Sequence, residues 1–143
     1  MTNSLSSALC AFAGLLCLAP LVGCAKNDRP PLGGVHGTVT LDGQPLAGAI
    51  VTFEPVGPGR GSIAMTDAQG RYELIYIRND KGAKVGAHRV QITTSNANAG
   101  KPELLPPRYN AQTTLSADVK AGDNEINFAL ASNGLFNRPT GTD

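Results

Sequence analysis

The chain has few aromatic residues and little net charge. Its 143 residues include four Phe, three Tyr and no Trp, and 12 basic residues nearly balance 11 acidic ones. A formal net charge of +1 predicts no strong field for nucleic acid. The lack of Trp disfavours a binding face built from stacked indoles. We therefore expect no nucleic-acid partner.

Cysteine is confined to the first 24 residues, at positions 10, 17 and 24. The chain after Cys24 can therefore form no disulfide, no cysteine-based metal site and no thiol nucleophile. The stability of any domain in that part must come from packing.

An apolar segment, residues 8–22, leads to the motif Leu21-Val22-Gly23-Cys24. Its length suits a signal helix and is short of the roughly 20 residues that a membrane span needs. The motif resembles the lipobox of bacterial lipoproteins. That resemblance implies cleavage between Gly23 and Cys24 and an acylated diacylglyceryl group, with palmitate-type chains, on Cys24. Residues 1–7 contain no Lys or Arg, unlike a typical signal, so an uncleaved N-terminal anchor is the alternative.

The lipoprotein resemblance also implies a location. Two or more acyl chains give stable anchoring, whereas a single chain binds a membrane only reversibly. Ala25 occupies the position where lipoproteins of the inner membrane often carry Asp. We expect a protein held in the cell envelope by membrane lipid at Cys24, at the outer membrane, facing the periplasm or the cell surface.

The composition divides the chain into four parts. Residues 1–23 form the signal peptide, and residues 24–34, rich in charge, Pro and Gly, form the lipidated cysteine and a flexible linker. Residues 35–131 form one domain, and residues 132–143 form a polar tail.

Apolar residues alternate with polar ones along short stretches of the domain, and Gly, Pro and Asp punctuate them. A period of two is typical of half-buried strands. The pattern predicts an all-β, seven-stranded antiparallel β-sandwich with no helix after the signal. The expected strands cover residues 35–41, 49–54, 63–66, 71–76, 88–93, 113–119 and 126–130.

Four motifs resemble those of carboxypeptidase regulatory-like domains: residues 37–39, 42–49, 51–53 and 66–74. The resemblance extends over about residues 35–130. It implies a transthyretin-like, prealbumin-type Greek-key sandwich. The motifs shape turns and pack the core, and none performs chemistry, so the resemblance implies no activity.

The loop at residues 95–112 contains the most distinctive surface motif, Leu104-Leu105-Pro106-Pro107-Arg108-Tyr109-Asn110. Its prolines can present Leu105, Arg108 and Tyr109 to a partner in an extended form. The alternative, which we favour, is that Leu105 and Tyr109 fold back over the sandwich and protect a sheet edge.

Two histidines and three tyrosines are the residues to weigh for metal binding. His36 shares its face with outward threonines, and His88 shares its face with Val90 at the start of a strand. Iron-binding enzymes with a similar sandwich use two His and two Tyr, but the local His spacing that they require is missing here. We expect a solvated His36, a partly packed His88 and no metal ligation.

Catalytic patterns are also weak. Ser62, His88 and Asp67 could be combined as a triad, but no Gly-x-Ser-x-Gly elbow accompanies them. Calcium would need carboxylates in an Asp-x-Asp-x-Asp cadence, which is missing, so turn capping better explains the loop aspartates. Those aspartates are Asp67, Asp80, Asp118 and Asp123. We expect no catalytic residue, no metal and no cofactor.

The sequence predicts a lipid-anchored cell-envelope protein whose non-catalytic β-sandwich is an interaction or structural module. Its partner would be another envelope protein or a carbohydrate. One alternative is a periplasmic small-molecule or carbohydrate-binding domain, motivated by the loops at 56–61 and 95–112 and requiring a concave pocket beside them. A metal-dependent enzyme is the third alternative.

Overall fold

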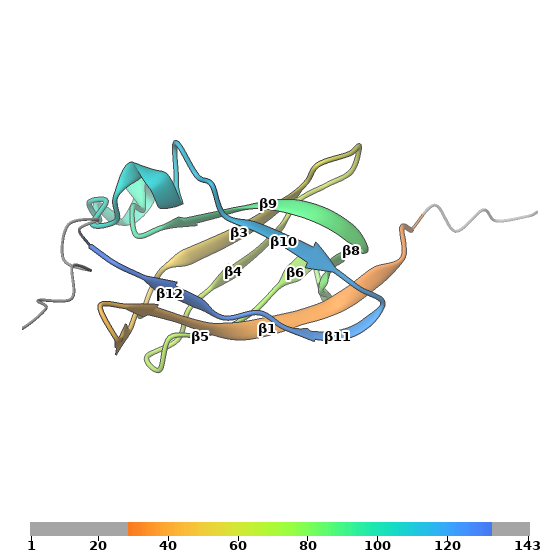
Figure 1. Ribbon diagram of the computed structural model, residues 1–143, viewed down its shortest axis with the longest axis horizontal. Coiled ribbons are helices and arrows are strands. Elements are labelled where there is room, and N and C mark those ends of the chain that lie inside the picture. Colours follow the sequence, from red (N-terminus) through yellow and green to blue (C-terminus); the bar gives the residue numbers. More distant parts are fainter. Residues whose placement is uncertain (1–28, 133–143) are drawn as a thin grey trace, which may run out of the picture.

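β-strands dominate the computed structural model, which describes residues 29–132 (Figure 1). Two short 3-10 helices, η1 (Ala97–Ala99) and η2 (Pro107–Tyr109), lie in the long loop before β10. The described strands are β1 (Leu32–Leu41), β2 (Gln44–Pro45), β3 (Ile50–Pro55), β4 (Ser62–Met65), β5 (Arg71–Glu73), β6 (Ile75–Ile77), β7 (Asp80–Lys81), β8 (Ala83–Lys84), β9 (Gly86–Thr93), β10 (Ser116–Val119), β11 (Gly122–Glu125) and β12 (Phe128–Leu130).

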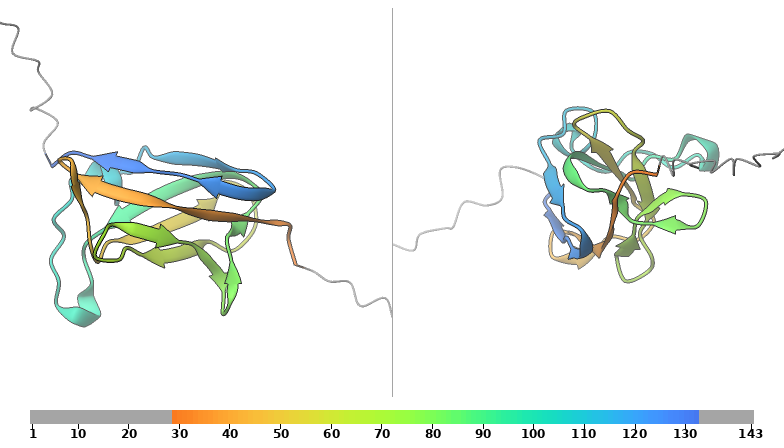
Figure 2. Two further views of the ribbon diagram at one scale, coloured as in Figure 1. Left: turned by 90° about the horizontal axis from the view of Figure 1, so that it is seen from below. Right: turned by 90° about the vertical axis from the view of Figure 1, so that its right-hand side faces the viewer.

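The strands form two sheets that face each other across the core (Figure 2). One sheet has the order β10-β9-β3-β4-β6-β7. In the other, β1 pairs with β11 and β12 on one side and with β2, β5 and β8 on the other. Both C-terminal strands run parallel to β1, whereas every other described pair of strands is antiparallel. The sandwich is thus mixed rather than purely antiparallel, because the chain leaves β10 in one sheet and returns alongside β1 in the other.

The first strand begins at Leu32, inside the segment expected to be a flexible linker (24–34). Gly33 is buried, and a Cβ at this position would lie 2.1 Å from the carbonyl oxygen of Lys120. Glycine therefore allows two backbones to approach too closely for any side chain. The linker is shorter than expected because its two glycines, which look like linker residues in sequence, belong to β1.

The segment expected as one strand, residues 71–76, is divided between the sheets. β5 pairs with β1, whereas β6 pairs with β4 through Ile63 and Ile75. Leu74 lies between them, fully buried, and its N–H donates to the Val35 carbonyl at 2.9 Å. This residue therefore links the two sheets at the point where the chain crosses.

Four further short strands lie outside the seven segments expected to be strands. They are β2, β7, β8 and β11. None of these four has the apolar alternation that would have identified it. Each forms because a neighbouring strand offers unpaired backbone groups.

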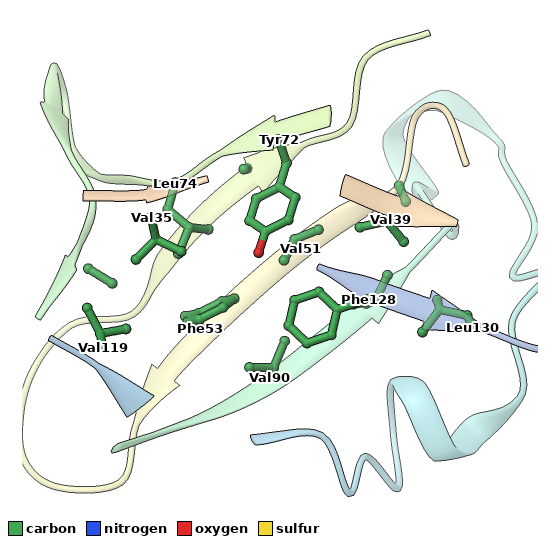
Figure 3. Close-up of a cluster of buried hydrophobic side chains, with 14 of the residues drawn as sticks. Val35, Val39, Val51, Phe53, Tyr72, Leu74, Val90, Val119, Phe128 and Leu130 are labelled. Carbon is green, nitrogen blue, oxygen red and sulfur yellow. The ribbon is translucent and has the colours of Figure 1, made fainter. Parts of the chain in front are cut away.

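Small aliphatic side chains and three aromatic rings fill the space between the sheets (Figure 3). The ring centroids of Phe53 and Phe128 lie 6.2 Å apart in an edge-to-face arrangement. Tyr72 lies beside them, and its hydroxyl donates to the Ile126 carbonyl at 2.6 Å. Burial raises the pKa of this phenol, so it stays a neutral donor. The inward alternation predicted for residues 35–39, 49–53 and 88–92 is confirmed.

The signal peptide (1–23), Cys24 and residues 133–143 of the tail lie outside the described residues. No helix between residues 29 and 132 is long and apolar enough to cross a membrane.

Candidate functional site

The sandwich has two ends with different loops (Figure 1). We call the end where the described chain begins the tether end, and it comprises residues 29–31, 56–61, 78–85 and 119–122. The opposite end, which we call the distal end, comprises residues 42–48, 66–70, 94–112 and 131–132. Any anchor that precedes residue 29 is therefore attached to the tether end.

Contacts at the tether end hold the incoming chain against the β6–β8 region. Arg29 pairs with Asp80, with Nη1 and Oδ2 3.2 Å apart. The Val85 N–H donates to the Pro31 carbonyl at 2.9 Å. A cavity of about 450 Å³ lies between residues 29–32 and 76–80. The chain is thus docked on the body from Arg29 onward.

The distal loop folds back onto the body, and it uses the three residues considered for partner binding. Leu105 is 5% exposed and belongs to the core. Arg108 donates to the Ala131 carbonyl at 2.7 Å, and the Ala131 N–H donates to the Tyr109 hydroxyl at 3.0 Å. The Arg108 guanidinium also lies over the Tyr109 ring, 4.9 Å from its centroid.

These contacts hold the backbone just beyond β12, and the protection of a sheet edge by this loop stays a prediction. Leu104, next to the buried Leu105, is 66% exposed and remains available on the surface. Partner binding by this loop stays a prediction, and Leu104 is the side chain that it could still present.

Glu103 organises the start of the same loop, and sequence reasoning did not identify it. Its carboxylate accepts hydrogen bonds from the Thr93 hydroxyl, from the Leu105 N–H at 2.9 Å, and from Thr94. The Thr94 N–H and hydroxyl donate at 3.1 and 2.9 Å. Desolvation alone would raise the pKa of this carboxyl, but the hydrogen bonds outweigh it and lower the pKa. No local spacing predicts this cluster, because the loop folding brings its members together.

A small cavity of about 190 Å³ opens beside this loop. It lies between residues 46–48 of the β2–β3 turn and residues 94 and 101–104. A concave pocket beside the loop at 95–112 was the condition for the ligand-binding alternative. The cavity is smaller than the roughly 300–1,000 Å³ of typical ligand sites.

The two histidines lie in different environments. The His36 Nδ1 is 3.2 Å from the Asp123 Oδ1, and both side chains are substantially exposed. His88 is 1% exposed, hence fully buried rather than partly packed, with its ring 5.8 Å from that of Phe53. Its Nδ1 lies 2.9 Å from the Gly86 carbonyl, to which it can only donate, which leaves Nε2 as an acceptor without a hydrogen-bond partner.

The residues considered for a triad are not linked by hydrogen bonds in the structure. The Oγ of Ser62 is buried without a partner, as is the His88 Nε2. Asp67 instead closes the turn before β5, where it accepts from the N–H groups of Gln69 and Arg71 at 2.9 Å each. The hydrogen bond from the Arg71 backbone is the main cause that lowers the pKa of Asp67.

The loop aspartates considered for calcium are dispersed. Asp80 pairs with Arg29, Asp123 pairs with His36, and Asp118 lies on β10. Within residues 29–132, no three or more His, Cys, Asp or Glu side chains are grouped so that they could hold a metal ion.

An apolar patch covers part of the outer face of the β3–β4–β6 region. Cross-strand pairs bring Ile50 next to Met65, and Ile63 next to Ile75. Met65 is 58% exposed, and a shallow hollow of about 310 Å³ lies over these side chains. In the sequence, the alternation of side chains places Ile50 and Ile75 on the outward faces of their strands. This placement was a signal for the patch that sequence reasoning did not use.

The residues proposed for lipidation and cleavage, Cys24 and Gly23, lie outside the part of the chain that the structure describes. No protein-family model and no curated protein matches the chain. Among solved structures, the chain is similar to a DUF3823 family protein from Parabacteroides merdae, with 17% sequence identity and a TM-score of 0.45. The similarity covers 71% of this chain and 46% of that protein, so the chain spans less than half of its length.

Proposed function

We propose that the protein is a lipid-anchored cell-envelope protein whose non-catalytic β-sandwich is an interaction or structural module. The lipobox-like residues 21–24 support the anchor. The observation that carries the arrangement is that the chain enters the sandwich at one end, while the long loop at 94–112 lies at the other (Figure 2). A lipid at Cys24 would then hold the tether end near the bilayer and present the distal end to partners.

The dimensions suit this role. Cys24 and Arg29 are five residues apart, so the connecting chain spans at most about 18 Å. β1 has 10 residues and extends over about 33 Å from the tether end toward the distal end. The distal loops would therefore stand clear of lipid headgroups, where an envelope protein or a carbohydrate could reach Leu104.

The finer fold assignment belongs to the same proposal. We take the domain as carboxypeptidase regulatory-like, with a seven-stranded, prealbumin-type Greek key as its basic plan. Each of the seven sequence segments expected to be strands contains at least one strand of the structure. The additional short strands are then local elaborations of this plan. The outer membrane is the proposed location, because Ala25 follows Cys24.

Intact mass measurement of the protein from a membrane fraction of its native host tests the anchor. The expected product begins at residue 24 and carries an acylated diacylglyceryl group. Cys24→Ala should abolish both the modification and the cleavage, leaving a chain that begins at Met1. An unmodified wild-type chain beginning at Met1, or one released freely from the membrane, would contradict the proposal.

Ligand binding at the distal cavity is the second candidate function. The observation in its favour is the hollow bordered by Gly48, Thr94 and Lys101, which offers the Lys101 cation beside apolar Leu46 and Leu104. Equilibrium binding of a panel of short oligosaccharides, with Lys101→Met as the comparison, tests it. Equal affinity of the two proteins for every sugar would remove this candidate.

A further inference from the structure

Basic side chains gather at the tether end. Six lie in its segments: Arg29, Arg60, Arg78, Lys81, Lys84 and Lys120. Five acidic residues lie in or against the same segments: Asp80, Asp118 and Asp123, Glu54 beside Gly61, and Glu73 paired with Lys81. The tether end therefore carries a positive excess of only one charge, and what distinguishes it is which of its basic side chains have partners.

Three of these basic side chains have no partner in the part of the chain that the structure describes. Arg29, Lys81 and Lys84 bind Asp80, Glu73 and the Pro58 carbonyl, respectively. Arg60, Arg78 and Lys120 are exposed and have no side-chain hydrogen bond or ion pair among residues 29–132. They come from three separate loops of the tether end. Three loops thus contribute free positive charge to one end of the sandwich.

An exposed apolar side chain begins one of these loops. Val56 is 76% exposed and begins the loop that carries Arg60. The Val56 N–H donates to the Ala87 carbonyl at 3.0 Å, and Lys84 holds the same loop through the Pro58 carbonyl at 2.6 Å. The loop is therefore held to the body at its start and near its middle, and an exposed apolar side chain lies at its base.

The distal end lacks this excess. Its segments contain Asp42, Asp67 and Glu103 together with Lys101 and Arg108, and Arg71 directly follows them. Arg71 pairs with Asp67 at 3.0 Å, and Arg108 donates to the Ala131 carbonyl. Positive charge at the distal end is thus balanced and mostly engaged, in contrast to the tether end.

The short tether brings the positive end close to any bilayer that holds Cys24. Because β1 takes up Leu32, Gly33 and Gly34, these residues cannot act as spacers. The remaining connection is shorter than the expected linker, and electrostatic attraction acts over about 10 Å at 0.1 M salt. Basic residues within that range of an anionic leaflet are attracted to it.

We propose that the tether end binds the anionic phospholipid headgroups of the bilayer in which the protein is anchored. Arg60, Arg78 and Lys120 contact the headgroup phosphates, and Val56 enters the interface between headgroups and acyl chains. This contact fixes the orientation of the sandwich and directs the distal end away from the membrane. The inference rests on the proposed anchor and deepens it by naming the surface on which the domain lies.

Tryptophan fluorescence tests this orientation, because the chain contains no Trp. The full chain carrying Val56→Trp is reconstituted into phosphatidylcholine vesicles, with and without phosphatidylglycerol. Leu104→Trp, also at an exposed apolar position, serves as the matched control at the distal end. Emission from position 56 should shift to the blue in anionic vesicles only, whereas emission from position 104 should not change.

Charge variants then identify the cause. In the Val56→Trp background, Arg60→Gln, Arg78→Gln and Lys120→Gln together should weaken the contact by about 100-fold and abolish the shift. Arg89→Gln with Lys101→Gln removes two basic side chains outside the tether end and should preserve it. In the Val56→Trp protein without charge substitutions, raising the salt to 1 M should also reverse the blue shift, because the distance over which charges attract each other then falls to about 3 Å.

Two outcomes would overturn the inference: equal emission from position 56 in both vesicles, or an anionic shift that the triple variant retains. Measuring the mass of the same preparation separates the test of the headgroup contact from the test of the lipid anchor. An acylated Cys24 without a shift refutes only the headgroup contact. A shift on added anionic vesicles without acylation supports the contact and refutes the anchor.

Discussion

The two ends of this sandwich differ in how many of their charged side chains are engaged. At the distal end, a carboxylate, a guanidinium and a phenol bind backbone groups and fold a long loop onto the core. At the tether end, Arg60, Arg78 and Lys120 are exposed and have no partner among residues 29–132. The comparison teaches that loops of similar composition can close the fold at one end and leave charged side chains free for contact at the other.

The backbones of the two ends differ as well. The tether end depends on glycines at close approaches: a Cβ on Gly33 or Gly82 would lie 2.1 Å from a backbone oxygen. Gly82 also has a φ of +106°, which a side chain would oppose. The distal end has such a glycine too, because a Cβ on Gly70 would lie 2.5 Å from the Val39 carbonyl oxygen. In addition, the distal end depends on side chains that bind backbone groups, so substitutions of these side chains should damage it by a second mechanism.

Leu105→Ala should have the largest effect on stability, lowering the free energy of unfolding by about 3 kcal/mol through a cavity in the core. Leu104→Ala, one residue away but exposed, should change it by less than about 0.5 kcal/mol. Urea unfolding of both variants measures the difference. Equal losses would mean that the distal loop does not close the core as the structure indicates.

Gly33→Ala should destabilise the tether end by about 2 kcal/mol, because the added methyl overlaps the Lys120 carbonyl. Gly57→Ala is the matched control in a loop of the same end, where a Cβ meets nothing within 4 Å. The midpoint of urea unfolding should fall for the first variant and stay close to wild type for the second. A tolerated Gly33→Ala would show that β1 and the turn before β11 can separate.

Glu103→Gln should have the smallest effect, about 1 kcal/mol at pH 7, because solvent screens a carboxylate at this exposed position. The folded state lowers the pKa of Glu103, so its stabilisation is present above the unfolded pKa and is lost as the pH falls through the folded pKa. The difference from wild type should therefore shrink in acid.

Urea unfolding of Glu103→Gln between pH 7 and pH 3 provides this measurement. Glu54→Gln, which removes an exposed carboxylate on β3, is the control and should show almost no difference at any pH. A constant difference for Glu103→Gln across the range would indicate that the lost hydrogen-bond geometry, rather than the charge, accounts for its effect.

Much of the sheet that contains β3 and β9 could be predicted from the alternation of apolar and polar residues alone. Val51, Phe53, Val90 and Ile92 face the core as their parity indicates. The sequence of a long strand with two distinct faces indicates which face is buried, because adjacent side chains point to opposite sides. The inward folding of Leu105 and Tyr109 was likewise one of the two interpretations of the 104–110 loop, whereas a role in covering a sheet edge stays a prediction.

Other features depended on partners far apart in the chain. β11 has almost no apolar residues, and it is a strand because β1 offers it a parallel partner. His88 is buried because it packs against Phe53 on a neighbouring strand, and the cluster around Glu103 forms because the loop after β9 folds back on the end of that strand. Short polar segments lack a face preference, so their own residues do not indicate where they pair.

The sequence by itself determined that the described domain is built from strands and which faces of the longer ones are buried, because alternation is a property of adjacent residues. It also determined the cysteine-free composition that leaves packing to stabilise the domain. Only the tertiary structure decided the parallel return beside β1, the crossing between sheets at Leu74 and which charged side chains at each end find partners. These features depend on distances between segments remote in the chain, and such distances exist only once the two sheets have packed.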